Sequence, residues 1–331
     1  MRRRGGIRLL LALLVLGAAV LARGWALERG AAVEDEGAAR IMFAPGGDAA
    51  EFARVLEPRP FSFPSDHGPH PEYRTEWWYY TGNLSNPGSG HFGYQLTFFR
   101  VGLAPESPPR LSRLAASQIY FAHFALSRPD GAYRSFERFS RGAGDLAGAS
   151  GVPFTVWLEN WSARALDEMG TLVALQAREE DIGLDLVLHA AKPIVAHGDG
   201  GVSAKGDEPG NASYYLSATR MSSQGEVQVG EESFAVTGNS WFDHEWGTSV
   251  LPASAVGWDW FGLQLSDGRE LMLYRIRGAD GSYERASSGT LVEKDGTAIH
   301  LRPEDFVVEA AGAWRSPRSG AVYPARWSVR V

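Results

Sequence analysis

The feature that most constrains the fold is residues 75–83, which read Thr-Glu-Trp-Trp-Tyr-Tyr-Thr-Gly-Asn. Four consecutive aromatic side chains cannot share one face of a β-strand, because successive side chains point to opposite sides. Trp77 and Tyr79 therefore line one face of the predicted strand. Trp78 and Tyr80 line the other face. Both faces must then be covered by other parts of the chain, or one of them must hold a ligand.

Polar groups are embedded in this aromatic sequence and in two similar clusters downstream. Glu76 would sit against apolar rings, where a carboxylate needs a partner or a raised pKa. Residues 241–247 read Trp-Phe-Asp-His-Glu-Trp-Gly, and residues 257–261 read Gly-Trp-Asp-Trp-Phe. We expect the three clusters to meet in space and form the functional site. The alternative is a hydrophobic core whose polar groups are satisfied.

Most of the chain after Glu76 shows the period of two that is typical of β-strands. Residues 91–101 and 182–190 alternate between apolar and other side chains, and turn residues such as those at 86–88 separate the segments. Short strands at this spacing predict an all-β fold of the barrel or sandwich type. Loops are predicted over 102–113 and 193–212. The predicted strands after Glu76 cover residues 91–101, 117–127, 132–139, 154–161, 171–178, 182–190, 213–220, 232–238, 257–266, 270–277, 287–293 and 297–301.

Composition excludes several classes of function. The 331-residue chain has a formal net charge of −7, so it lacks the basic surface of a nucleic-acid-binding protein. It has no cysteine, which excludes disulfides, thiolate zinc sites and a cysteine nucleophile. It has no Gly-x-Ser-x-Gly motif, so nothing supports hydrolysis by a serine triad. Eleven tryptophans favour ring-lined cavities, and we expect no cofactor.

The N-terminus predicts export. Four arginines among the first eight residues precede an apolar stretch over 9–22, and small residues follow at Ala22 and Ala26. This is the pattern of a secretory signal peptide, predicted here as residues 1–26 and followed by a linker over 27–60. The apolar stretch is shorter than the roughly 20 residues that span a bilayer, so an uncleaved membrane anchor is the less favoured alternative. Export without disulfides suits a bacterial periplasm or cell surface.

Three motifs carry a resemblance to a known family. Residues 70–82 resemble the signature of the AttH-like and CrtC-like lipocalin family, and residues 241–247 and 257–261 resemble its second and third signatures. The resemblance extends from about Phe61 to the C-terminus. It implies two lipocalin-like β-barrels packed together, which we predict over 61–244 and 245–331.

The relatives in this family are diverse. They include exported proteins, some named secreted hydrolases, some associated with ABC transporter permeases, carotenoid 1,2-hydratases and fungal phytoalexin hydratases. An ABC transporter permease is therefore an expected partner. Family members carry further strands after the segment that corresponds to Tyr323–Trp327, so we expect the natural chain to continue past Val331.

The chain departs from the carotenoid hydratases near a predicted catalytic residue. It resembles those enzymes at His244, Trp246 and Tyr274. An acidic residue closely follows the tyrosine in the enzymes, whereas Arg275 and Ile276 follow it here. This difference removes a candidate proton donor and argues against carotenoid hydration. Hydration of another apolar substrate stays an alternative.

Two classes of function fit the aromatic clusters. The first is a carrier that binds a small lipophilic molecule, a lipid or isoprenoid, in an aromatic-lined cavity. The second is a hydratase, isomerase or hydrolase in which Asp243, His244 and Tyr274 act as acid–base groups beside cation-stabilising rings. Adjacent strand residues point oppositely, so Asp243 and His244 share a site only if a bulge or turn intervenes. The predicted ligand-binding residues are Glu76, Trp77, Trp78, Tyr80, Trp246, Trp258 and Trp260.

The polar residues also bear on two other arrangements, a metal site and a buried structural network. Residues 66–72 contain two histidines and two carboxylates, but their prolines favour an extended segment across a barrel mouth over a metal site. Three consecutive residues such as 243–245 rarely converge on one ion, so we predict no metal there either. These three residues could instead form a buried structural network with Arg74, Arg275 or Arg277.

Overall fold

The computed structural model describes residues 52–104, 117–248, 251–252, 254–317 and 319–331. The predicted signal peptide and most of the predicted linker lie outside these residues. In the described part of the chain, no helix has the length and apolar character needed to cross a membrane. The described residues fall into two units, 52–308 with 329–331 and 309–328.

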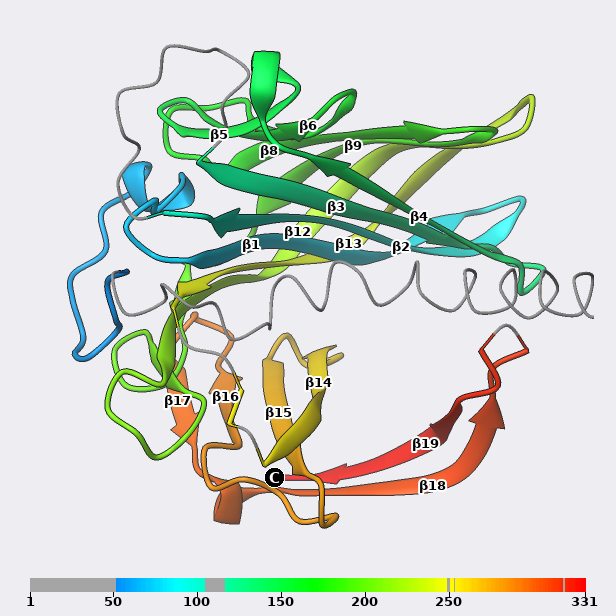
Figure 1. The fold of residues 1–331 in the computed structure, drawn as a ribbon. Helices are drawn as coiled ribbons and strands as arrows, with labels where there is room; N and C mark the ends of the chain where they lie inside the picture. Colours follow the sequence, from blue (N-terminus) through cyan, green and yellow to red (C-terminus); the bar gives the residue numbers. More distant parts are fainter. Residues whose placement is uncertain (1–51, 105–116, 249–250, 253, 318) are drawn as a thin grey trace, which may run out of the picture. The chain divides into compact units, whose positions relative to one another are not determined.

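Thirteen of the described strands form one antiparallel sheet (Figure 1). In order across the sheet, eleven of them are β4 (Tyr133–Ser140), β3 (Gln118–Ser127), β2 (Gly90–Gly102), β1 (Thr75–Asn86), β13 (Glu232–Gly247), β12 (Ala212–Val229), β9 (Ile182–Ala190), β8 (Leu172–Glu179), β7 (Trp161–Ala165), β6 (Phe154–Leu158) and β5 (Ala147–Gly151). The short strands β10 (Val195–Ala196) and β11 (Val202–Ala204) both pair with β12. Short 3₁₀ turns cover Ser65–His67 (η3), Ala143–Asp145 (η4) and Pro303–Asp305 (η5).

The sheet curls into a nearly closed barrel. Figure 1 shows β5, β6, β8 and β9 across from β1, β2 and β13, and β6 lies against β2, β3 and β4. Strand β4, at one end of the sheet, has no backbone pairing with β8. Arg138 of β4 nevertheless forms ion pairs with Glu159 and with Glu179 of β8. The predicted all-β, lipocalin-like fold class is therefore confirmed.

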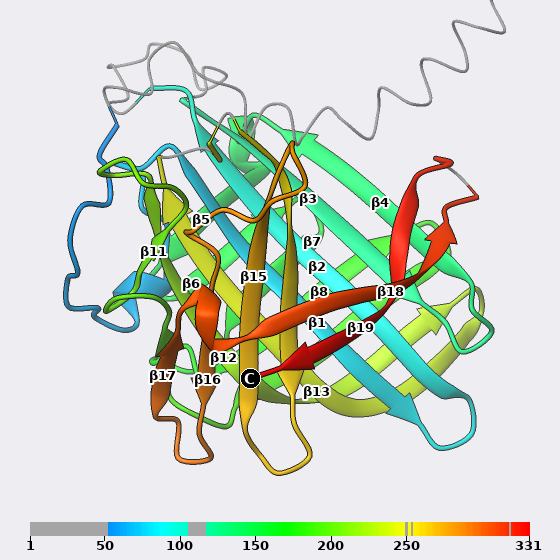
Figure 2. The same cartoon turned by 90° about the horizontal axis from the view of Figure 1, so that it is seen from below.

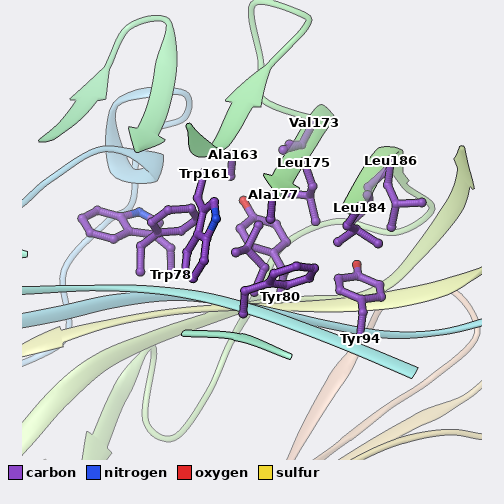
Figure 3. Close-up of a cluster of buried hydrophobic side chains, with 14 of the residues drawn as sticks. Trp78, Tyr80, Tyr94, Trp161, Ala163, Val173, Leu175, Ala177, Leu184 and Leu186 are labelled. Carbon is purple, nitrogen blue, oxygen red and sulfur yellow. The ribbon is translucent and has the colours of Figure 1, made fainter. Parts of the chain in front are cut away.

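Alternation along β1 separates its aromatic residues as predicted. Trp78 and Tyr80 are fully buried in the barrel, whereas Trp77 and Tyr79 lie half-buried on the outer face. In Figure 3, Trp78 and Tyr80 project from one wall toward the apolar side chains of β7, β8 and β9. The labelled residues on that opposite side are Trp161, Ala163, Val173, Leu175, Ala177, Leu184 and Leu186.

A second antiparallel sheet covers part of the barrel's outer face. It consists of β14 (Ala255–Gln264), β15 (Glu270–Gly278), β16 (Ser288–Val292) and β17 (Ala298–Leu301), and Figure 2 shows it in front of the large sheet. The Gln264 amide donates to the carbonyl oxygens of Thr219 (2.9 Å) and Ser240 (3.0 Å). The buried carboxylate of Glu270 accepts from Lys192 at 2.8 Å and Arg220 at 2.6 Å. These contacts bury the outer face of β12 and β13.

Several boundaries differ from the sequence-based expectations. The strand predicted over 154–161 is two strands, because Glu159 adopts a left-handed φ of 56° that permits a tight hairpin turn. The boundary predicted between residues 244 and 245 falls within β13. Strand β5 and the hairpin of β18 (Val307–Arg315) and β19 (Val322–Arg330) were not predicted.

Candidate functional site

Strand β13 carries polar groups on both of its faces. His244 and Trp246 point toward the barrel side, together with Phe242 of the barrel core. Asp243 points the opposite way, toward the second sheet. The register between β1 and β13 is regular here, with Trp78 opposite His244 and no bulge beside it. The structure therefore does not bring Asp243 and His244 into the single cavity predicted from the sequence.

Glu76 is the centre of the inner polar cluster. Its side chain is fully buried, and its carboxylate accepts from Arg100 Nε at 2.8 Å. The other carboxylate oxygen lies 2.8 Å from His70 Nδ1 and 3.0 Å from His244 Nε2. Burial alone would raise the pKa of Glu76, but the Arg100 charge and the two histidines hold it well below its usual value. A carboxylate inside the fold is thus stabilised by cations and donors from three segments.

His70 links this carboxylate to a second one. Its Nε2 lies 3.1 Å from Asp66 Oδ1, so both ring nitrogens face carboxylates. Burial opposes a charged ring, but Asp66 and Glu76 together raise the pKa of His70. The Trp246 indole stacks on this imidazole with ring centroids 3.9 Å apart. Trp246 therefore supports the polar network and is not a wall of an open cavity.

His244 closes the network from β13. Its ring stacks on Trp78 at 5.0 Å, and its Nδ1 lies 3.1 Å from the backbone carbonyl of Asp66. Complete burial lowers the pKa of His244, although the hydrogen bond with Glu76 acts in the opposite direction. The segment around η3 is held over this end of the barrel by β1, because Trp78 Nε1 donates to the carbonyl of His67 at 2.9 Å.

The geometry of His70, Glu76 and His244 meets the distance requirement of a metal site but not its electrostatics. Their potential ligand atoms lie within 4.8 Å of one another. The Glu76 oxygens are already engaged by both imidazoles and by the permanently charged Arg100 guanidinium. A divalent cation would have to displace these bonds beside that positive charge. We interpret the cluster as a satisfied hydrogen-bond network.

The outer cluster contains the other predicted acid. Asp243 is buried and accepts from Ser217 Oγ and from Trp241 Nε1 at 2.6 Å. Burial raises the pKa of Asp243 to about 7, against the opposing effect of these donors and Tyr215. Asp243 is therefore a carboxyl group that can hold its proton near neutral pH.

Lys205 and Tyr274 belong to the same outer cluster. Lys205 Nζ forms an ion pair with Glu245 at 2.7 Å and lies 4.8 Å from the centroid of the Tyr274 ring. The Tyr274 hydroxyl donates to the carbonyl of Ala204 at 3.0 Å. The cation of this cluster is Lys205, from a predicted loop. Two of the arginines expected in that role have other partners, because Arg275 donates to the carbonyl of Phe306 and Arg277 contacts Asp259.

The remaining predicted residues also divide between the faces. Trp260 donates to the Tyr215 hydroxyl at 3.0 Å in the outer cluster. Trp77 lies opposite Glu245 in the β1–β13 ladder and shares that side. The Trp258 side chain is 44% exposed, which argues against a place in the wall of an enclosed site.

A cavity of about 320 Å³ lies inside the barrel, apart from the Asp243 cluster. Its walls are mainly aromatic and aliphatic side chains from the η3 segment, β1, β6, β8, β12 and β13. Tyr80 is the predicted ligand-binding residue that lines it. Ala218 and Met221 both face it because a register shift interrupts β12 between them. No sequence signal marked that bulge, and His67 and Lys192 were missed as lining residues.

Comparison with known proteins agrees with this architecture. A family profile described as AttH-like matches residues 54–331. A crystal structure of a protein from Nitrosomonas europaea, described as an AttH, is 32% identical, with a TM-score of 0.76 over 84% of this chain and 83% of that one. Kievitone hydratase from Nectria haematococca shares the fold, with a TM-score of 0.60 over 85% of this chain and 80% of that one, at 12% identity. No curated protein matches the sequence.

The similarity to the Nitrosomonas protein extends over most of both chains, and the profile includes all three aromatic clusters. The kievitone hydratase similarity is too low in sequence identity to carry more than the fold. The profile match and the 32% identity are together decisive: this chain belongs to the AttH-like family.

Proposed function

We propose that the protein binds a small lipophilic molecule inside the barrel. The observation that supports this is the cavity of about 320 Å³, whose walls are mostly aromatic and aliphatic. Ligand sites are concave, mainly apolar and contain a few polar groups, and barrels of this kind hold one small ligand.

The enzymatic alternative has one observation in its favour. Asp243 has a pKa raised to about 7 by burial, as an acid catalyst requires. However, Asp243 and His244 face opposite sides of β13, so they cannot act as an acid–base pair on one substrate. Asp243 is also hydrogen-bonded to Ser217 and Trp241. We therefore favour ligand binding and treat the Asp243 cluster as structural.

Filling the cavity should weaken binding. The purified protein should bind the neutral fluorophore phenylnaphthylamine, and Ala218→Phe should weaken binding at least about tenfold by occupying the apolar space. Ala298→Phe, on an exposed position of β17, is the matched control and should bind like the parent. Fluorescence titration gives the affinities and melting temperature confirms folding. Equal affinity in a folded Ala218→Phe protein would place the probe elsewhere and contradict the proposal.

We also propose that the chain is exported, on the strength of its arginine-rich, apolar N-terminus. N-terminal sequencing of protein from a periplasmic fraction should then begin at Arg23 or Leu27. An intact Met1 on cytosolic protein would refute export. The association with an ABC transporter permease stays a prediction from the family resemblance, and co-purification would test it.

A further inference from the structure

Tyr80 lines the cavity and carries a buried hydroxyl group without a hydrogen-bond partner among the described residues. Tyr80 has no exposed surface, and its hydroxyl oxygen has no hydrogen bond with any residue that the structure describes. Leaving such a group unpaired is unfavourable. By contrast, the Tyr94 hydroxyl, on the neighbouring strand, lies 2.6 Å from Ser240 Oγ. The wall of the cavity therefore includes one residue, Tyr80, whose hydrogen-bonding capacity is unused.

Lys192 lines the cavity but does not offer its charge there. Its Nζ donates to Glu270 at 2.8 Å and to the carbonyl oxygens of Gly268 (2.7 Å) and Glu293 (2.8 Å). An ammonium group has three donors, and all three are thereby used by the second sheet and its turns. The lysine contributes its aliphatic stem to the wall, and its ammonium group lies outside the cavity.

His67 supplies no positive charge either. Its Nε2 lies 3.2 Å from the carbonyl of Met169, which can only accept, so Nε2 carries the hydrogen and Nδ1 is left as an acceptor. Burial and the neighbouring His244 lower the pKa of His67 to about 4. Burial likewise raises the pKa of Tyr80 well above its ordinary value. The three titratable groups in the wall thus present hydrogen-bonding capacity without a free charge.

We propose that the cavity selects an uncharged lipophile that carries one hydroxyl group, held by a hydrogen bond with Tyr80, and rejects fatty-acid anions. This inference rests on the proposed function, because it names the ligand class for the same cavity. A ligand alcohol can both donate to and accept from the phenol, whereas a carboxylate would be buried without a cation.

Competition of three eight-carbon probes against phenylnaphthylamine tests the proposal. Octanol should displace the fluorophore at least about a hundredfold more effectively than octanoate at pH 8, because the ionised carboxylate would lose its hydration. Tyr80→Phe should weaken octanol binding about three- to tenfold, the effect of one hydrogen bond. The same substitution should leave octane binding within about twofold, since octane makes no hydrogen bond.

Tyr94→Phe provides the control. It also removes a buried phenolic hydroxyl, but one that bonds to Ser240 and does not line the cavity, so octanol binding should stay within about twofold of the parent. Equal binding of octanol and octanoate, or an unchanged octanol affinity in Tyr80→Phe, would overturn the inference while leaving the cavity a binding site. Failure of every probe, including phenylnaphthylamine, would instead reject the proposed function itself.

Discussion

Glu76→Gln should lower the free energy of unfolding by about 3–5 kcal/mol, the range for breaking a buried ion pair by removing one partner. The glutamine has nearly the same shape, so the loss arises from charge and hydrogen bonding. Arg100, which is 1% exposed, would keep its positive charge without the carboxylate that now lies 2.8 Å away. His70 would also lose one of its two carboxylate partners.

Equilibrium denaturation in urea at neutral pH measures this effect. Glu180→Gln is the matched control, because Glu180 also pairs with an arginine, Arg134, but its side chain is 62% exposed. That surface pair should contribute almost nothing measurable. If the two variants lost the same small amount of stability, the Glu76 network would not be the structural centre that its geometry indicates.

Only part of this network could be predicted from the sequence. Alternation along one strand shows which face a residue occupies, but not which residue lies opposite it. The period of two along residues 75–83 places Glu76 and Trp78 on the same face, and it predicts that a carboxylate there needs a partner. It does not identify the partner, because strand register is set by the whole sheet. Arg100 lies opposite Glu76 only through the β1–β2 pairing, at a separation of 24 residues.

The same limit explains the division of the predicted site. Alternation along 241–247 places Asp243 and His244 on opposite faces, and no bulge in β13 reverses this. A bulge lies instead in β12, between Ala218 and Met221, in a segment without a glycine or proline to signal it. Lys205 comes from a predicted loop, where a lysine is ordinarily solvated. Only the folded arrangement places it beside Glu245.

Asp243 has a pH-dependent effect on stability whose sign follows from its raised pKa. The folded-state pKa is about 7, above the ordinary value of 3.8, so the folded protein keeps a proton that the unfolded chain loses. The resulting stabilisation is fully present below pH 3.8 and is lost as the pH rises through 7. At about 1.36 kcal/mol per pH unit, the loss between about pH 4.5 and pH 8 is roughly 3 kcal/mol.

Asp243→Asn isolates this contribution, because asparagine does not titrate. The stability of the parent relative to the variant should fall by about 3 kcal/mol from pH 4.5 to pH 8, measured by urea denaturation at each pH. The groups facing Asp243, namely Tyr215, Glu245 and Lys205, are common to both proteins, so their own titration largely cancels. Phenylnaphthylamine affinity should stay within about twofold, because Asp243 lies on the face of β13 away from the cavity. A flat stability difference would show that Asp243 is ionised throughout, and a lost affinity would mean that the outer cluster belongs to the binding site after all.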